Sequence, residues 1–232
     1  VEDENGTLVL TFLMNDRNLI LYGEGAQVDE AIEEVIEDLV NEGLEVPGVV
    51  GPTEIVNGFA EKWAAQKKYT PILKMKQKIY RLDQVNRIQK SPGRLRLAEE
   101  ADLQLVADWI YAFAAAIQDE HFTRDKAFEK AEKDIREKTL YLWQDGQPVS
   151  MAKKSRPTKN GIVISLVYTP PQFRSQGYAS SCVAALSELL LCDGYKFCSL
   201  YTDLANPTSN HIYSNIGYKP IQDSVMVQFR GN

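Results

Sequence analysis

Cysteine, histidine and long apolar runs are all scarce in this chain. Its 232 residues include three cysteines and two histidines. Cys182, Cys192 and Cys198 do not have the spacing of metal ligands, so we expect no metal site and interpret them as reduced thiols. No apolar run approaches the roughly 20 residues of a membrane span, and the acidic first residues are unlike a secretory leader. We therefore expect a cytoplasmic protein with no membrane partner.

Positive charge is scarce as well. The chain carries 26 lysines and arginines against 32 aspartates and glutamates, a formal net charge of −6. Such a chain has no basic field to attract a polyanion, so we expect no nucleic-acid partner. Lys74, Lys76 and Lys78 alternate with apolar residues at the period of a strand, and we interpret them as its solvated face rather than as a phosphate-binding patch.

The first 90 residues predict a small α/β domain. Apolar residues recur at helical spacing over residues 28–40 with carboxylates between them, which indicates an amphipathic helix with a solvated acidic face. Pro52 can open a second helix, because the first turn of a helix needs no N–H there. The expected elements are strands at residues 8–14 and 19–22, a helix at 28–40, a short strand at Leu44, a helix from Pro52 to about Gln66, and a strand over 73–79. The start at Val1, directly before a strand-like run, leaves open that this domain is truncated.

A domain boundary is expected at residues 91–93, Ser-Pro-Gly, where three turn-forming residues follow one another. We therefore divide the chain into domains of residues 1–90 and 94–232. Asp102 and Thr123 are candidate N-caps of two helices. The expected elements of the second domain are strands at 94–98, 141–144, 148–152, 162–168 and 197–202, helices from 102, 123, 177 and 207, and a strand at 218–229 that closes the sheet. This alternation predicts an α/β fold with a mixed sheet flanked by helices.

The segment from Val167 to Ala179 joins a β-prone run to the start of a helix and reads Val-Tyr-Thr-Pro-Pro-Gln-Phe-Arg-Ser-Gln-Gly-Tyr-Ala. The first turn of a helix presents unpaired N–H groups and the positive end of the helix dipole, a combination that binds phosphate groups. Gly177 and Ala179 let the backbone approach a ligand closely, and Arg174 can either contact a phosphate or fix the loop. The segment therefore predicts an anion-binding turn.

This segment resembles the acetyl-CoA loop of the GNAT acetyltransferase superfamily, which reads Arg/Gln-x-x-Gly-x-Gly/Ala after a strand ending in Val-x-Val. Here Val167-x-Thr169 stands at the end of the strand. Residues 206–218, Asn-Pro-Thr-Ser-Asn-His-Ile-Tyr-Ser-Asn-Ile-Gly-Tyr, are similar to a second signature of the same proteins, Asn-x-x-Ser-x-x-x-Tyr-x-x-x-Gly-Phe/Tyr. Both motifs occur in the family's order. By this resemblance the second domain is identified as a catalytic GNAT domain, similar to the glycine N-acyltransferases.

The resemblance implies roles for individual residues. Val167 and Thr169 would offer main-chain groups to the pantetheine arm of acetyl-CoA, and Asn206 would bind its amides, with Ser209 nearby. Tyr213 would lie beside the thioester sulfur as the general acid, which suits a phenol that is protonated at neutral pH. The residues implied to surround the pyrophosphate are Arg174, Ser175, Gln176, Gly177, Tyr178, Ala179 and Ser180. The implied reaction is N-acetyl transfer from acetyl-CoA to a primary amine by direct attack on the thioester, without a metal.

The resemblance does not supply a general base. Many family members carry a carboxylate in the strand that corresponds to residues 162–168, and this chain has none there. Three alternatives for the base stay open. They are Asp203 acting through a water, Glu120, and His121. The acceptor, a small-molecule or peptide amine, stays open too, because acceptor pockets are built from variable loops.

The first domain repeats the order of elements of the second but not its motifs. Its loop at residues 23–26, Gly-Glu-Gly-Ala, stands where the pyrophosphate loop stands in the second domain. It has no arginine, and Glu24 would repel a phosphate. We interpret this domain as a degenerate GNAT-like unit in tandem with the second, and expect one acetyl-CoA per chain. The alternative function is a non-catalytic acyl-CoA-binding regulatory module.

Overall fold

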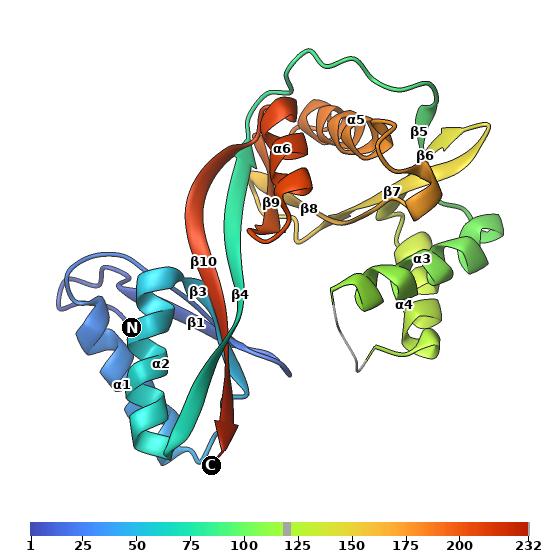
Figure 1. Cartoon of the computed structure of the whole chain (residues 1–232). Coiled ribbons are helices and arrows are strands. Elements are labelled where there is room, and N and C mark those ends of the chain that lie inside the picture. Colours follow the sequence, from blue (N-terminus) through green and yellow to red (C-terminus); the bar gives the residue numbers. More distant parts are fainter. Residues whose placement is uncertain (118–121, 232) are drawn as a thin grey trace. The chain divides into compact units, whose positions relative to one another are not determined.

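The computed structural model describes residues 1–117 and 122–231, which fold into two compact units (Figure 1). The first unit contains Val1–Ile79, Thr202–Asn206 and the residues from Pro220 on, and the second contains Tyr80–Tyr201 and Pro207–Lys219. Each unit combines helices with a sheet, in agreement with the predicted α/β class. The units are discontinuous in sequence, in contrast to the single boundary expected at residues 91–93.

The sheet of the first unit has its strands in the order β1-β2-β3-β10-β4, and α1 and α2 cover one face of it. The elements are β1 (Leu10–Met14), β2 (Leu19–Gly23), α1 (Val28–Asn41), β3 (Gly48–Pro52), α2 (Thr53–Lys67), β4 (Tyr69–Leu82) and β10 (Lys219–Gly231). β1 and β2 form the predicted antiparallel hairpin. Ile32 and Val35 of α1 are buried against the strands, while the carboxylates between the apolar positions face solvent. Burial of this stripe confirms the amphipathic helix.

Two strand predictions for this unit are wrong. Leu44 is exposed and lies in no strand; β3 begins at Gly48 instead and pairs with β2 in parallel. The C-terminal strand, expected to close the sheet of the second domain, pairs antiparallel with β3, with Val225 opposite Gly51 and Val227 opposite Val49. Val225 and Val227 are buried in the core of the first unit. Burial of these apolar side chains favours that placement.

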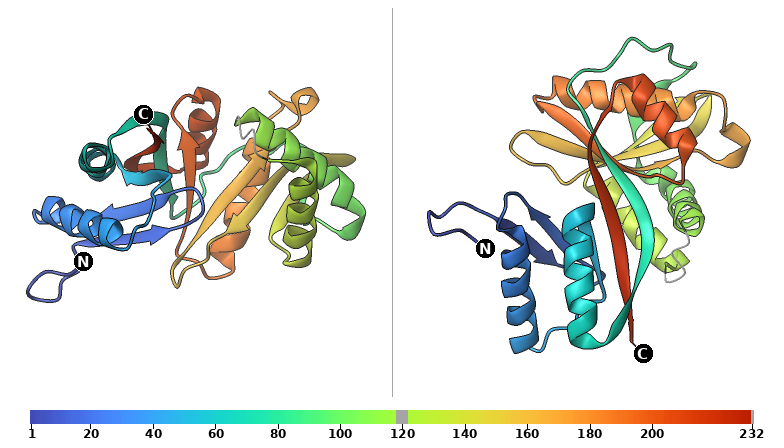
Figure 2. Two further views of the ribbon diagram at one scale, coloured as in Figure 1. Left: turned by 90° about the horizontal axis from the view of Figure 1, so that it is seen from below. Right: turned by 60° about the vertical axis from the view of Figure 1, so that its left-hand side comes forward.

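The sheet of the second unit has the strand order β9-β8-β7-β6-β5, with helices on both faces (Figure 2). Successive residues of β6 alternate between the faces: Tyr141 and Trp143 join the core beneath α5, and Leu140 and Leu142 join the core beneath α3 and α4. The elements are β5 (Arg94–Leu97), η1 (Glu100–Asp102), α3 (Leu103–Ala116), α4 (Arg124–Arg136), β6 (Leu140–Asp145), β7 (Gln147–Ser155), β8 (Gly161–Tyr168), η2 (Pro171–Phe173), α5 (Tyr178–Cys192), β9 (Phe197–Asp203) and α6 (Pro207–Ile216), where η denotes a 3₁₀ helix.

The two predicted helix caps have different outcomes. Thr123 caps α4 as predicted, because its hydroxyl oxygen accepts the N–H of Lys126 at 3.3 Å. Asp102 precedes α3 but does not cap it with its side chain. Its carboxylate accepts two hydrogen bonds from Arg96, at 2.6 and 2.8 Å, and the Arg96 guanidinium lowers the pKa of Asp102. A bidentate arginine–carboxylate pair adds attraction between opposite charges to two hydrogen bonds, so the carboxylate turns toward the arginine.

All three cysteines are free thiols. Cys182 and Cys198 are buried in the core beneath α5, and burial raises the pKa of each to about 12. Cys192 is exposed at the end of α5. Among the described residues, no helix has both the length and the apolar composition that crossing a membrane requires. The same residues include no group of three or more His, Cys, Asp or Glu side chains placed to hold a metal.

Candidate functional site

The predicted anion-binding turn lies between β8 and α5. The short helix η2 follows β8, and Gly177 immediately precedes α5. The φ angle of Gly177 is 77°, in the left-handed region that glycine adopts without strain. A Cβ at this position would lie 2.7 Å from the Ser91 hydroxyl oxygen. Both the backbone conformation and the closeness of Ser91 therefore favour glycine here.

A bulge in β8 comes just before this turn. Leu166 has a φ of 51°, and the register of β8 against β7 shifts so that Leu166 and Val167 together face Ala152. On its other side, β8 pairs in parallel with β9 over residues 161–163, near its start. Bulges interrupt the ladder and are frequent beside binding sites. Val167 thus lies where the strand departs from regular pairing.

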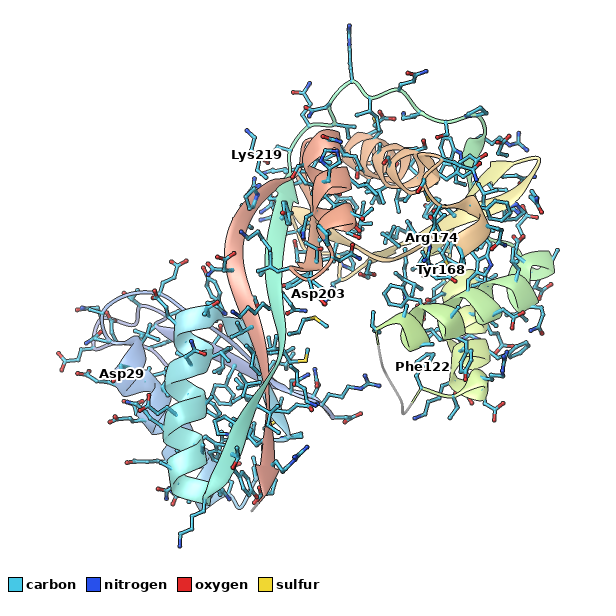
Figure 3. All side chains as sticks on the ribbon, in the orientation of Figure 1. Asp29, Phe122, Tyr168, Arg174, Asp203 and Lys219 are labelled. Carbon is cyan, nitrogen blue, oxygen red and sulfur yellow. The ribbon has the colours of Figure 1, made fainter. Side chains whose placement is uncertain are left out.

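Arg174 fixes the turn from within. Its Nε donates a hydrogen bond to the carbonyl oxygen of Thr169 at 3.0 Å, and its side chain is exposed (Figure 3). Ser150, a residue that sequence reasoning missed, is buried behind the same segment. Its hydroxyl donates to the carbonyl of Tyr168 at 3.2 Å and lies 2.9 Å from the Thr169 hydroxyl oxygen. Of the two roles predicted for Arg174, the structure shows the one within the loop.

The first residue of α5 is anchored to the neighbouring hairpin. The Tyr178 hydroxyl donates to Asp145, at the end of β6, at 2.7 Å, and this carboxylate raises the pKa of Tyr178. Ala179 and Ser180 follow in the first turn of the helix. The N–H groups of a first turn have no partner within their own helix. Residues 174–180 thus form one turn that ends in the first turn of α5; their role in binding a ligand stays a prediction.

Tyr213 lies on α6, which packs against α5 within the second unit. Its side chain is buried in the core beneath α5, and its ring meets that of Tyr218 edge to face at a centroid distance of 6.0 Å. Burial raises the pKa of Tyr213 to about 12, and a hydrogen bond with Ser209 partly opposes this effect. Tyr213 is therefore protonated at neutral pH.

Asn206 precedes α6, and its N–H donates to the carbonyl of Asp203 at 3.0 Å.

The candidate bases receive no further support. Asp203 ends β9, and its carboxylate accepts the N–H of Ala205 at 2.8 Å. Glu120 and His121 lie outside the described residues. His211 lies on α6, two residues before Tyr213, and is exposed. Its Nε2 lies 2.9 Å from the side-chain nitrogen of Asn215.

Ser91 is the second residue that sequence reasoning missed, since it was expected only as part of a linker. Its N–H donates to the Ser181 hydroxyl oxygen at 2.8 Å, and its hydroxyl donates to the carbonyl of Gln176 at 2.7 Å. The indole N–H of Trp143 donates to the carbonyl of Pro92 at 2.9 Å. The partners of Ser91 are 90 and 85 residues away in sequence, so no local pattern could have found it.

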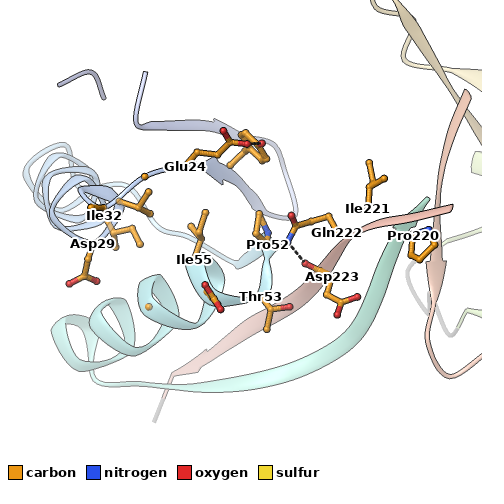
Figure 4. Close-up of a pocket in the computed structure, with 17 residues that line it drawn as sticks. Glu24, Asp29, Ile32, Pro52, Thr53, Ile55, Pro220, Ile221, Gln222 and Asp223 are labelled. Atoms are coloured by element: carbon orange, nitrogen blue, oxygen red, sulfur yellow. Dashed lines mark hydrogen bonds between the residues drawn. The ribbon is translucent and has the colours of Figure 1, made fainter. Parts of the chain in front are cut away.

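A cavity of about 950 Å³ lies in the first unit, lined by the loop after β2, the starts of α1 and α2, and β10 (Figure 4). Four carboxylates line it: Glu24, Asp29, Glu54 and Asp223. No lysine or arginine is among the described residues of its lining, although Lys62 pairs with Asp29 at 3.0 Å and Lys78 with Asp223 at 3.2 Å. The cavity therefore lacks the charge that would favour phosphate groups.

The chain resembles a known protein family and several solved structures. The family model for FR47-like proteins matches residues 144–227. The chain is similar to a solved acetyltransferase of the GNAT family from Colwellia psychrerythraea, with a TM-score of 0.64 and 16% identity over 97% of this chain and 83% of the other. It is also similar to GCN5-related N-acetyltransferases from Kribbella flavida (TM-score 0.62, 16% identity, 97% and 88% covered) and Sphaerobacter thermophilus (0.64, 14%, 100% and 80%).

A comparison with curated protein sequences gives no match. The stretch matched by the FR47-like family includes both the turn before α5 and the helix that carries Tyr213. Structural similarity at such low identity establishes the fold. The chain therefore has the fold of the GCN5-related N-acetyltransferases.

Proposed function

We propose that this protein transfers an acetyl group from acetyl-CoA to a primary amine. The observation that carries the proposal is the turn at residues 174–180, in which the left-handed Gly177 immediately precedes α5, in the connection that follows the bulged strand β8. Such a turn offers main-chain N–H groups and a helix dipole to a diphosphate and needs few basic side chains. That requirement suits a chain with a net charge of −6. The solved relatives named as acetyltransferases support the same activity.

In this proposal the acyl donor runs along the end of β8. Val167 and Thr169 contact the pantetheine arm through the main chain, with Asn206 and Ser209 binding its amides. The carbonyl of Thr169 already accepts a hydrogen bond from Arg174. We therefore assign the N–H of Thr169, rather than its carbonyl, to the contact with the arm.

The role of Tyr213 follows from its pKa. The amine nitrogen forms a bond to the thioester carbon, the C–S bond breaks, and a proton moves in net from the amine to the leaving thiolate. With a pKa of about 12 against a thiol near 8.5, complete proton transfer from Tyr213 would cost about 5 kcal/mol. Donation of a hydrogen bond to the developing thiolate avoids that cost. Tyr213 thus stabilises the leaving thiolate by a hydrogen bond. The proton that the amine loses is the one that finally converts this thiolate to the thiol of CoA.

In this proposal the first unit is a degenerate GNAT-like unit that binds no acetyl-CoA.

Glycine is the first acceptor to test, because the second unit resembles the glycine N-acyltransferases; other small-molecule amines and peptide amines follow. We propose that the protein works in the cytoplasm without a metal, a nucleic acid or a membrane as partner.

Release of free CoA thiol tests the activity. The full chain is mixed with acetyl-CoA and a panel of amines, with a blank that lacks amine to subtract the exposed Cys192 thiol. We expect amine-dependent thiol release from at least one acceptor class. Calorimetric binding of acetyl-CoA without release for any amine would favour the non-catalytic acyl-CoA-binding module instead. Absence of binding would contradict both functions.

A further inference from the structure

We propose that Ser91 is a positioning residue that holds the anion-binding turn in its ligand-binding conformation. The proposal rests on the proposed function, since it concerns the same turn. Ser91 belongs to residues 83–93, which join β4 to β5 and have no helix or strand. We call this segment the strap.

The strap fixes the orientation of one peptide bond in the turn. The Ser91 hydroxyl donates to the carbonyl oxygen of Gln176 at 2.7 Å. In a trans peptide the carbonyl of one residue and the N–H of the next point in opposite directions. A Gln176 carbonyl held toward Ser91 therefore directs the Gly177 N–H away from the strap, toward the side on which the first turn of α5 offers its other N–H groups.

The next peptide bond is held from the same side. The Ser181 hydroxyl donates to the carbonyl of Gly177 at 2.9 Å and accepts the N–H of Ser91 at 2.8 Å. Ser181 is fully buried, so this network is shielded from competing water. The carbonyls of Gln176 and Gly177 thus both accept hydrogen bonds from serine hydroxyl groups on the strap side of the turn. The opposite side, where we place the ligand, then presents N–H groups.

The strap also reaches the helix that carries Tyr213. The main-chain N–H of Asn86 donates to the carbonyl of Ile216 at 2.8 Å, and its side-chain amide donates to the carbonyl of Asn215 at 3.1 Å. Lys90 pairs with Glu188 on α5. One irregular segment therefore contacts both helices of the candidate site, α5 and α6, and Ser91 is its point of contact with the turn.

The test compares two acyl donors on full-length variants. Acetyl-CoA contains the diphosphate, whereas S-acetyl-pantetheine carries the same thioester and arm without it. Ser91→Ala should raise the KM for acetyl-CoA about three- to tenfold, as expected for the loss of one hydrogen bond, and leave kcat unchanged. The KM for S-acetyl-pantetheine should not change. Ser91→Thr, which keeps the hydroxyl, should restore most of the affinity for acetyl-CoA.

Gln89→Ala is the matched control, because Gln89 is exposed in the same strap two residues away. It should leave both donors unaffected. Equal losses with both donors, or an unchanged KM for acetyl-CoA in Ser91→Ala, would overturn the positioning role while the proposed function stands. A wild-type chain that neither binds nor uses acetyl-CoA would instead overturn the proposed function, and the role of Ser91 with it.

Discussion

Two loops lie at the same position in the element order of the two units and differ in nearly every chemical respect. The loop between β2 and α1 contains Glu24, whose carboxylate accepts a hydrogen bond from the Tyr22 hydroxyl. The loop between β8 and α5 contains Arg174, which is bound to its own loop. Gly25 in the first has a φ of 100° and open space around it, whereas Gly177 in the second is packed against Ser91. The loop between β2 and α1 is therefore acidic, with open space around its glycine. The loop between β8 and α5 is basic, and Ser91 is hydrogen-bonded to it.

The difference teaches that a strand-loop-helix arrangement alone does not make a phosphate site. Both α1 and α5 begin after a strand and offer the positive end of a helix dipole. In the first unit that end already has Asp29 and Glu30 in its first turn and Glu24 beside it. A bound diphosphate there would meet three carboxylates, whereas in the second unit it would meet no acidic residue in the first turn of α5.

The largest expected effect is on turnover. Tyr213→Phe keeps the ring and its packing but removes the hydroxyl, so kcat should fall roughly 10²-fold or more while acetyl-CoA affinity changes little. Steady-state kinetics together with calorimetric titration measure both quantities. Full turnover in this variant would remove Tyr213 from the chemistry.

Tyr218→Phe is the matched control, since Tyr218 is the buried ring partner of Tyr213 and its hydroxyl lies 2.9 Å from that of Ser187. It should lower stability without changing the mechanism. The pH dependence adds a second readout. A tyrosine pKa raised by folding contributes stability that is present below the unfolded pKa near 10 and is lost as pH rises toward about 12. Turnover should therefore show no loss from Tyr213 ionisation up to about pH 10.

An intermediate effect is expected on cofactor binding. Arg174→Glu makes the second loop resemble the first in charge, and acetyl-CoA affinity should fall more than tenfold, a loss of about 1.4 kcal/mol or more. Arg174→Gln separates the two roles of the residue, because it removes the charge but keeps a donor for the carbonyl of Thr169. We expect it to lose less affinity than Arg174→Glu. Unchanged calorimetric affinity in Arg174→Glu would place the cofactor elsewhere.

The smallest effect is expected in the first unit. Glu24→Gln neutralises a carboxylate that we place outside the cofactor site, so acetyl-CoA affinity should stay within twofold of the wild-type value. Titration should give one cofactor per chain for both proteins. A stoichiometry of two, or a clear gain in affinity on neutralising Glu24, would mean that the first unit also takes part in cofactor binding.

Local sequence patterns predicted most elements of both units and the turn itself. The helical stripe of α1, the hairpin of β6 and β7, and the small residues before α5 each lie within about 15 consecutive residues, so their physical causes are visible in the sequence. The partner of β10 is different. Val225 and Val227 read as strand residues, but nothing near them indicates whether they pair with a strand of the first unit or of the second.

Competing interactions explain the remaining misses at the site. Asp102 could cap a helix or pair with Arg96, and the stronger charged pair determined the outcome. Ser91, within a Ser-Pro-Gly sequence, has every feature of a linker residue, yet its two hydrogen-bond partners lie in α5 and the turn before it. Pairing between residues 85 or more positions apart depends on the complete fold. The sequence therefore located the turn but not its support.

The placement of the thiols determines where this protein can be chemically labelled. Cys182 and Cys198 are buried with pKa values raised to about 12, so at neutral pH both stay protonated and shielded from alkylating reagents. Cys192 is exposed and is the last residue of α5, a helix of 15 residues whose first turn belongs to the candidate site. At a rise of 1.5 Å per residue, a fluorophore on Cys192 would stand roughly 20 Å from that turn. A single maleimide dye should therefore report on the chain without further mutation and without obstructing the acyl donor.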